Sequence, residues 1–201
     1  MLRMNKIAID VVLLPPDDVM DICIEVNKTF GALSSLDKKK CLPHISLWMG
    51  VIEKNQLEEM RKRLQQLGDK FSSVPVEIVT VDYTLKPDGR KSWCFRVKKS
   101  KELVELHKLV KQAIHPLCTY DATTSMFNQD DPVDEQSLTW VNNFAKNHKR
   151  STQFDPHISL RCKNDVVFSD VPIVFTASRL ALCHLGDHCT CRRILFETEL
   201  L

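Results

Sequence analysis

The sequence predicts an α+β protein in which helices cover the outer faces of antiparallel sheets. Three observations support this fold class. The pentapeptide Pro-His-Ile-Ser-Leu occurs twice, at 43–47 and at 156–160. A strand and a helix are predicted ahead of each copy, so one structural unit is used twice. The last thirty residues are rich in β-prone residues broken by turn signals.

Composition and charge limit the classes of protein that this chain can be. Its 201 residues, 43% hydrophobic and 27% charged, are ordinary for a folded domain and exclude disordered and fibrous classes. The formal net charge of +2 gives no general electrostatic reason to wrap nucleic acid or to lie on a membrane. The eight cysteines are scattered and too sparse for a disulfide scaffold, which favours a reducing compartment. We therefore expect the protein in the cytoplasm, or in the nucleus of a eukaryote. We also expect a monomer, although no pattern in the sequence determines the oligomeric state.

The first half alternates strands and helices. Asp17 and Asp18 follow Pro16 at the start of the first helix, where negative charge favours the helix dipole. Gly68 closes the second helix. The expected elements are a strand, a helix, the first histidine strand, a helix and a strand, at 7–13, 16–30, 43–51, 57–67 and 74–85.

The second half begins after a predicted turn at Pro87-Asp88-Gly89. A strand, a helix and the second histidine strand follow, with an insertion at 117–150 that contains a polar loop and a helix at 132–147. Three C-terminal strands complete the chain, at 171–175, 179–185 and 191–200. The expected organisation is a single domain, 1–201, of two lobes at about 1–86 and 90–201.

The two pentapeptides place their polar side chains on one face of a strand, because alternate residues of a strand share a face. His44 and Ser46 then point one way, and the aliphatic residues between them the other. In the second copy His157, Ser159 and Arg161 share a face. Two such strands facing a common space would form a symmetrical polar cleft.

Two facing histidines can divide proton transfer, because a pKa near about 6.5 makes the neutral base and the protonated acid both accessible near neutral pH. Serine hydroxyls two residues further on would donate hydrogen bonds to non-bridging phosphate oxygens. The matching substrate is a phosphodiester, in which one oxygen attacks and another leaves. This chemistry needs no metal and no cofactor.

The paired motifs resemble those of the 2H phosphoesterase superfamily, which includes RNA 2′,3′-cyclic phosphodiesterases, 2′-5′ RNA ligase-like proteins and nucleotide cyclic phosphodiesterases. The resemblance implies a bilobal fold with pseudo-twofold symmetry and a central cleft. It also implies catalytic roles for His44 and His157 and phosphate-binding roles for Ser46 and Ser159. The implied substrate is an RNA or nucleotide cyclic phosphate, opened to a terminal phosphomonoester.

Further substrate contacts are expected around these four residues. Trp48 and Arg161 come two residues after the serines and are candidates for substrate contact. The alternative role for Trp48 is packing in the core, and the alternative for Arg161 is a surface ion pair. Aromatic side chains could stack on a base. The candidates for stacking are Tyr83, Tyr120, Phe127 and Phe154.

Several alternatives remain open. The segment 183–191 holds five cysteine and histidine residues and could bind zinc, although a tight Gly186-Asp187 turn would send these side chains to both faces of a hairpin. The same fold could trim RNA 3′ ends or join 2′-5′ linkages, or the chain could be a non-catalytic RNA- or nucleotide-binding module. Which histidine is the acid, and whether 117–150 closes over the cleft, also stay open.

Overall fold

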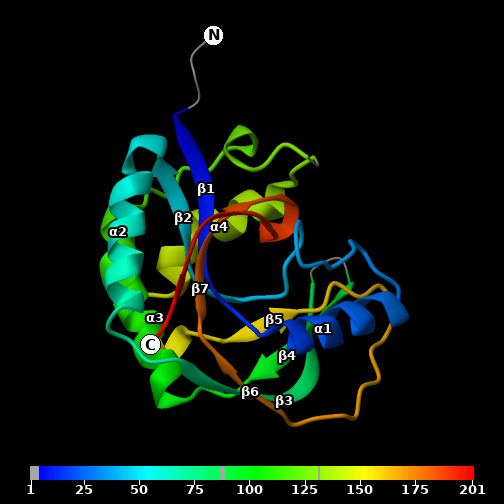
Figure 1. Ribbon diagram of the computed structural model, residues 1–201. Helices are drawn as coiled ribbons and strands as arrows, with labels where there is room; N and C mark the ends of the chain where they lie inside the picture. The colour runs from blue at the N-terminus through cyan, green and yellow to red at the C-terminus, as the bar shows by residue number, and fades with distance from the viewer. Residues whose placement is uncertain (1–4, 87–88, 131) are drawn as a thin grey trace.

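The computed structural model describes residues 5–86, 89–130 and 132–201 and contains two four-stranded antiparallel sheets (Figure 1). The first sheet has the strand order β2-β1-β7-β8. Its strands are β1 (Lys6–Leu14), β2 (Ile45–Glu53), β7 (Arg179–Leu185) and β8 (Cys191–Glu199). The second sheet has the order β5-β4-β3-β6. Its strands are β3 (Val74–Leu85), β4 (Lys91–Val97), β5 (His157–Ser159) and β6 (Ile173–Ala177).

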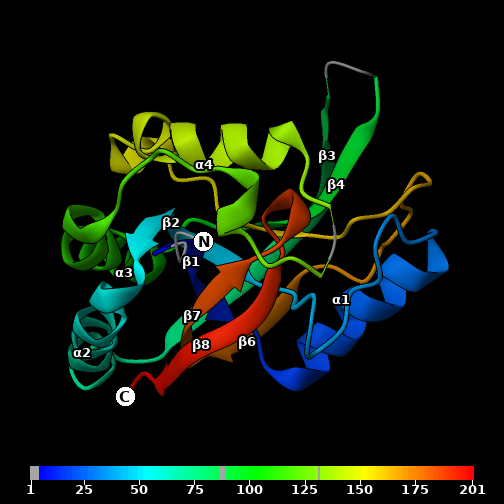
Figure 2. The same ribbon diagram turned by 90° about the horizontal axis from the view of Figure 1, so that it is seen from above.

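Four α-helices complete the described part of the chain, so the predicted α+β class is confirmed. They are α1 (Asp17–Thr29), α2 (Leu57–Gly68), α3 (Lys101–Ile114) and α4 (Glu135–Asn147). Figure 2 shows α2 and α3 side by side, with α1 on the opposite side of the molecule and α4 across the strands. No helix among the described residues could span a bilayer, since none combines enough length with enough apolarity.

The strand β1 lies at the centre of the fold and is buried along most of its length. Ile9 and Val11 point into the main hydrophobic core, which also contains Val76 and Phe95 of the second sheet. The residues of β1 between these positions point to the other face. Because both faces of β1 are covered, the one acidic residue of this strand is forced into the interior.

The expected division into lobes at 1–86 and 90–201 does not describe the two sheets, because they exchange strands. The strand β3 belongs to the second sheet, and β7 and β8 return to the first. The physical reason is that a buried strand needs backbone partners on both edges. The strand β1 pairs with β2 on one edge and with β7 on the other. Pro87 and Asp88 of the predicted turn lie outside the described residues.

The expected two-residue turn at Gly186-Asp187 is wrong. Leu185 of β7 pairs with Cys191 of β8, so the connection spans 186–190. His188 and Cys189 have positive φ angles, 53° and 54°. The loop is closed by the Gly186 N–H, which donates to the Thr190 carbonyl at 2.8 Å. This longer turn directs His188 toward the cavity described below.

Candidate active site

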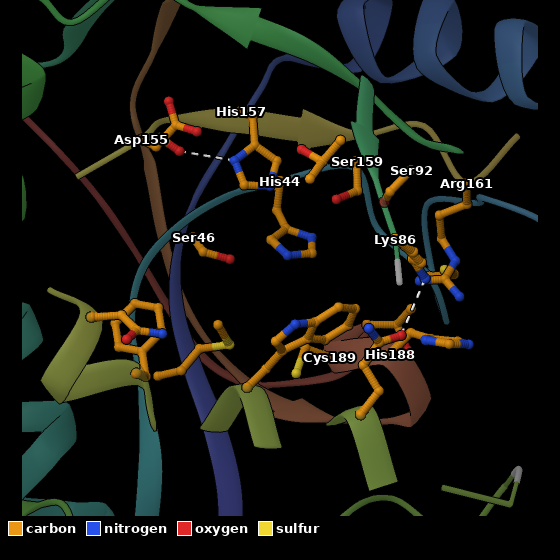
Figure 3. A pocket seen from close by; sticks show the side chains of 18 of the residues that line it. His44, Ser46, Lys86, Ser92, Asp155, His157, Ser159, Arg161, His188 and Cys189 are labelled. Atoms are coloured by element: carbon orange, nitrogen blue, oxygen red, sulfur yellow. Dashed lines mark hydrogen bonds between the residues drawn. The ribbon is translucent and has the colours of Figure 1, made fainter. Parts of the chain in front are cut away.

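Both pentapeptides line one cavity of about 470 Å³ between the two sheets. His44 and Ser46 enter it from the first sheet, and His157 and Ser159 enter it from the second. Figure 3 shows the two imidazole rings directed into the same space. Arg161 also lines the cavity, as its position after the second serine predicted. The structure therefore brings together five of the side chains that the sequence singled out.

The two histidine rings are held in the same way. The Nδ1 atom of His44 lies 2.6 Å from the Leu42 carbonyl oxygen, and that of His157 lies 2.8 Å from the Asp155 carbonyl oxygen. In both cases the carbonyl belongs to the residue before the motif's proline, and a residue in that place is restricted to extended conformations. A neutral ring that donates from Nδ1 leaves Nε2 as an acceptor. The proline thus helps to set the tautomer.

His44 is the more enclosed of the two histidines. Its side chain is 14% exposed. Burial lowers the pKa of His44 to about 4, and the neighbouring His157 and Arg161 add to this effect. The hydrogen bond to Leu42 acts in the opposite direction and is outweighed. His44 is therefore neutral near pH 7, with a lone pair on Nε2.

Asp10 lies directly behind the first motif, and it is fully buried on β1. Ser46 Oγ is hydrogen-bonded to Asp10 Oδ2 at 2.6 Å, and His44 Nε2 lies 3.8 Å from the same oxygen. Burial raises the pKa of Asp10 to about 8, against the effects of the hydrogen bonds from Ser46 and from the Trp48 backbone. Asp10 was not among the residues predicted from the sequence. The available signal was that it is the only charged residue between Ile7 and Leu14.

Among the residues that the structure describes, no buried acid lies behind the second motif. His157 pairs across the sheet with Arg96, which forms ion pairs with Asp155 at 2.5 Å and with Asp82 at 3.1 Å. Ser159 is exposed, and its hydroxyl forms no hydrogen bond with any residue that the structure describes. The surroundings of the second pentapeptide are thus polar and open, whereas those of the first pentapeptide are buried.

Arg161 and the β7–β8 turn meet at one end of the cavity (Figure 3). Arg161 lies two residues after the end of β5 and has a φ angle of 53°, and its Nε donates to Ser34 Oγ. Burial lowers the pKa of Arg161 from its ordinary value, but a guanidinium remains charged near pH 7. His188 lies 3.5 Å from a carboxylate oxygen of Asp187. This end of the cavity therefore offers a fixed positive charge.

Trp48 does not contact the cavity, contrary to expectation. The pairing of β1 with β2 shifts by one residue between Ser46 and Trp48, which reverses the side-chain alternation. Met49 therefore lines the cavity, while Trp48 is fully buried. The Trp48 Nε1–H donates to the Tyr120 hydroxyl at 3.1 Å, so both predicted contacts serve the core.

The other aromatic candidates divide between the cavity and elsewhere. Phe154 lines the cavity, whereas Tyr83 is 41% exposed outside its lining and Phe127 is buried in a separate hydrophobic cluster. The expected insertion supplies a residue that was not predicted from the sequence, because α4 packs over β2 and presents Trp140 to the cavity. Lys86 lies over the Trp140 ring, 5.6 Å from its centroid. The insertion thus forms one wall of the cavity.

The zinc alternative at 183–191 is not supported by the ligand positions. Among the described residues, no group of three or more close ligand atoms is made from this segment alone. One group consists of Asp10, His44 and Cys191, and another of Asp134, Asp187 and His188. Each offers three ligands, where a structural zinc site takes four. We assign neither group to a metal.

No protein-family model matches the sequence, and no curated protein matches it. The fold nevertheless matches solved structures over nearly their whole length. TT0787 of Thermus thermophilus aligns with a TM-score of 0.60 and 14% identity, over 96% of this chain and 98% of that one. Escherichia coli LigT complexed with NADP⁺ aligns at 0.57 and 11%, and LigT complexed with 3′-AMP at 0.55 and 12%, each over 97% of this chain and 98% of LigT.

A further structure, described as a phosphoesterase, aligns with a TM-score of 0.50 and 14% identity, over 96% of this chain and 98% of that one. The chain therefore shares the fold of TT0787, LigT and this phosphoesterase, which agrees with the fold that the resemblance of the paired motifs implied. At these identities the likeness concerns the fold, and the chemistry of the site depends on the residues of this chain.

Proposed function

We propose that this protein is a metal-independent phosphodiesterase that opens 2′,3′-cyclic phosphates or cleaves short 2′-5′- or 3′-5′-linked oligonucleotides. The observation that carries the proposal is the meeting of two His-x-Ser motifs, one from each sheet, in a single cavity. A pair of histidines supplies a base and an acid, and a pair of serines supplies two hydrogen-bond donors. These are the groups that in-line displacement at a phosphodiester requires.

His44 is the general base in this proposal. Its burial keeps the imidazole neutral near pH 7, and its Nδ1 contact with the Leu42 carbonyl leaves Nε2 free to take a proton from the attacking water. His157 is the general acid and protonates the leaving oxygen. Its ring lies at the more exposed side of the cavity, where water can solvate an imidazolium. After one turnover the two histidines have exchanged protonation states, and solvent restores them.

The phosphate is bound by Ser46, Ser159 and Arg161. A hydroxyl from each sheet can donate to a non-bridging oxygen, and the guanidinium of Arg161 balances the negative charge. These interactions are stronger at the enclosed side of the cavity than in bulk solution. Because charge increases on the non-bridging oxygens as water attacks, donors placed in advance stabilise the transition state.

A nucleotide is the substrate class that the cavity favours. Trp140 and Phe154 present aromatic surfaces beside the polar groups, which suits a base next to a phosphate. The LigT structures contain 3′-AMP and NADP⁺, which supports a nucleotide ligand for this fold. A volume of about 470 Å³ suits a mononucleotide or the end of an oligonucleotide.

The test is hydrolysis of a nucleoside 2′,3′-cyclic phosphate from about pH 4 to about pH 9, with EDTA present. The wild type is compared with the single variants His44→Ala and His157→Ala and with the double variant. We expect a bell-shaped profile whose acidic limb lies near pH 4, because His44 must lose its proton to act as a base. Turnover should vanish in the double variant.

Two results would contradict the proposal. Full activity of the double variant would place the chemistry elsewhere. Binding of a nucleotide without turnover of cyclic phosphates or of 2′-5′- and 3′-5′-linked oligonucleotides would instead indicate a binding module. Cleavage only at RNA 3′ ends, or joining of 2′-5′ linkages, would keep the two-histidine mechanism and change the substrate.

A further inference from the structure

Asp10 is a buried acid whose hydrogen bonding is incomplete. It is fully buried on β1, and its Oδ1 atom has no hydrogen-bond partner among the described residues. Its other oxygen, Oδ2, is 2.6 Å from Ser46 Oγ and 3.8 Å from His44 Nε2. An ionised carboxylate with an unpartnered oxygen in an apolar interior is costly, whereas a neutral carboxyl group is much less so.

The protonation state of Asp10 determines what Ser46 can do, because a serine hydroxyl has one proton and two lone pairs. If Asp10 is ionised, it accepts the Ser46 proton, and the serine cannot donate to a ligand without breaking the 2.6 Å contact. If Asp10 is protonated, the carboxyl donates to Ser46 Oγ. The serine proton is then free to point into the cavity.

We propose that Asp10 is a positioning residue that is protonated in the resting protein and, by donating a hydrogen bond to Ser46 Oγ, directs the serine hydroxyl proton toward a bound phosphate oxygen. This inference rests on the proposed role of Ser46 as a phosphate ligand. A neutral Asp10 also spares the bound phosphate the repulsion of a second negative charge.

Burial favours the neutral form of Asp10 and outweighs the hydrogen bonds from Ser46 and from the Trp48 backbone, which favour the ionised form. His44 faces Asp10 from the segment before β2, Cys189 from the β7–β8 turn, and Cys191 from β8. On β7 the residue that pairs with Asp10 is Cys183. Burial raises the pKa of Asp10 to about 8 and lowers that of His44 to about 4, so both groups are neutral near pH 7.

The first experiment observes the carboxyl directly. The protein is labelled with ¹³C at aspartate Cγ, and the Asp10 resonance is identified by its loss in Asp10→Asn. We expect its titration midpoint above pH 7. A midpoint below pH 7 would overturn the inference. This measurement requires no ligand and no turnover, so its result is independent of the proposed function.

The second experiment measures sulfate binding from about pH 5 to about pH 9. Sulfate keeps its charge throughout this range, so any change in affinity comes from the protein. In the wild type we expect affinity to fall about tenfold as Asp10 ionises. Asp10→Asn, whose amide donates to Ser46 at every pH, should lack this step. Ser159→Ala is the matched control: it should weaken binding and keep the step, while Ser46→Ala should weaken binding and lose it.

Failure of the inference about Asp10 can be distinguished from failure of the proposed phosphate site. Identical pH dependence in the wild type and in Asp10→Asn would overturn the role of Asp10. Absence of sulfate binding by the wild type, with Asp10 still protonated, would overturn the phosphate role of Ser46 and with it the proposed site.

Discussion

The segment that carries His44 and the segment that carries His157 have the same five residues and different neighbours. The first copy belongs to a nine-residue strand beside the buried β1, with Asp10 behind its serine. The second belongs to a three-residue strand beside β4, with the exposed Arg96–Asp155 ion pair next to its histidine. Each histidine nevertheless contacts the carbonyl two residues before it.

In the proposed mechanism, this difference allows one repeated motif to supply two different roles. The local pentapeptide sets the orientation of the ring and of the hydroxyl, and is the same in both copies. The depth of burial differs between the copies, and in the first copy it keeps His44 neutral near pH 7. A base and an acid can therefore arise from one repeated motif, because a pKa depends on surroundings.

The largest effect is expected when the two histidines are replaced one at a time. We expect His44→Ala and His157→Ala each to lower kcat by about a thousandfold, because each removes one proton-transfer group. Steady-state hydrolysis of the cyclic phosphate measures the effect. The acidic limb near pH 4 should disappear only in His44→Ala. Loss of that limb in His157→Ala instead would reverse the assignment of base and acid.

The residues two positions after each serine should respond in opposite ways. Trp48→Ala should lower the free energy of unfolding by about 3–5 kcal/mol, because Trp48 is fully buried and the substitution leaves a cavity. Arg161→Ala should mainly weaken nucleotide binding, by about tenfold, since it removes a charged contact in the cavity. Urea denaturation and ligand titration separate the two effects. A stable Trp48→Ala variant with impaired binding would restore Trp48 as a substrate contact.

The two serines should differ in stability and resemble each other in binding. Ser46→Ala removes the partner of the buried Asp10 and should cost about 2 kcal/mol of unfolding free energy at pH 6. Ser159→Ala changes an exposed hydroxyl and should cost much less. Chemical denaturation of both variants measures this contrast. Equal losses would mean that the Asp10 contact contributes nothing to the stability of the first motif.

The most gradual effect, spread over several pH units, is the pH dependence of stability that Asp10 imposes. Its pKa is about 8 in the folded protein and about 4 in an unfolded chain, so the folded state holds a proton that the unfolded state releases between these values. Stability from this group is complete below pH 4 and is lost as pH rises to 8. The wild type should lose about 1.4 kcal/mol per pH unit relative to Asp10→Asn in this window. Parallel curves for the two proteins would show that Asp10 is already ionised.

Sequence alone predicted most of the local structure. The α+β class, the strands and helices and the shared face of His44 and Ser46 follow from periodicity, which is a property of neighbouring residues. Two predictions failed where local rules were overridden. The register shift in β2 turned Trp48 into the core, and the left-handed conformation of His188 and Cys189 lengthened the turn of the last hairpin.

The repeated pentapeptide by itself determined that the chain carries two histidines and two serines suited to a phosphate, because the side-chain alternation of a strand is a local rule. Only the tertiary structure decided that β7 returns to β1, that α4 forms a wall of the cavity and that Asp10 lies behind Ser46. The physical reason is that burial, and the protonation that depends on it, comes from contacts between residues far apart in the chain.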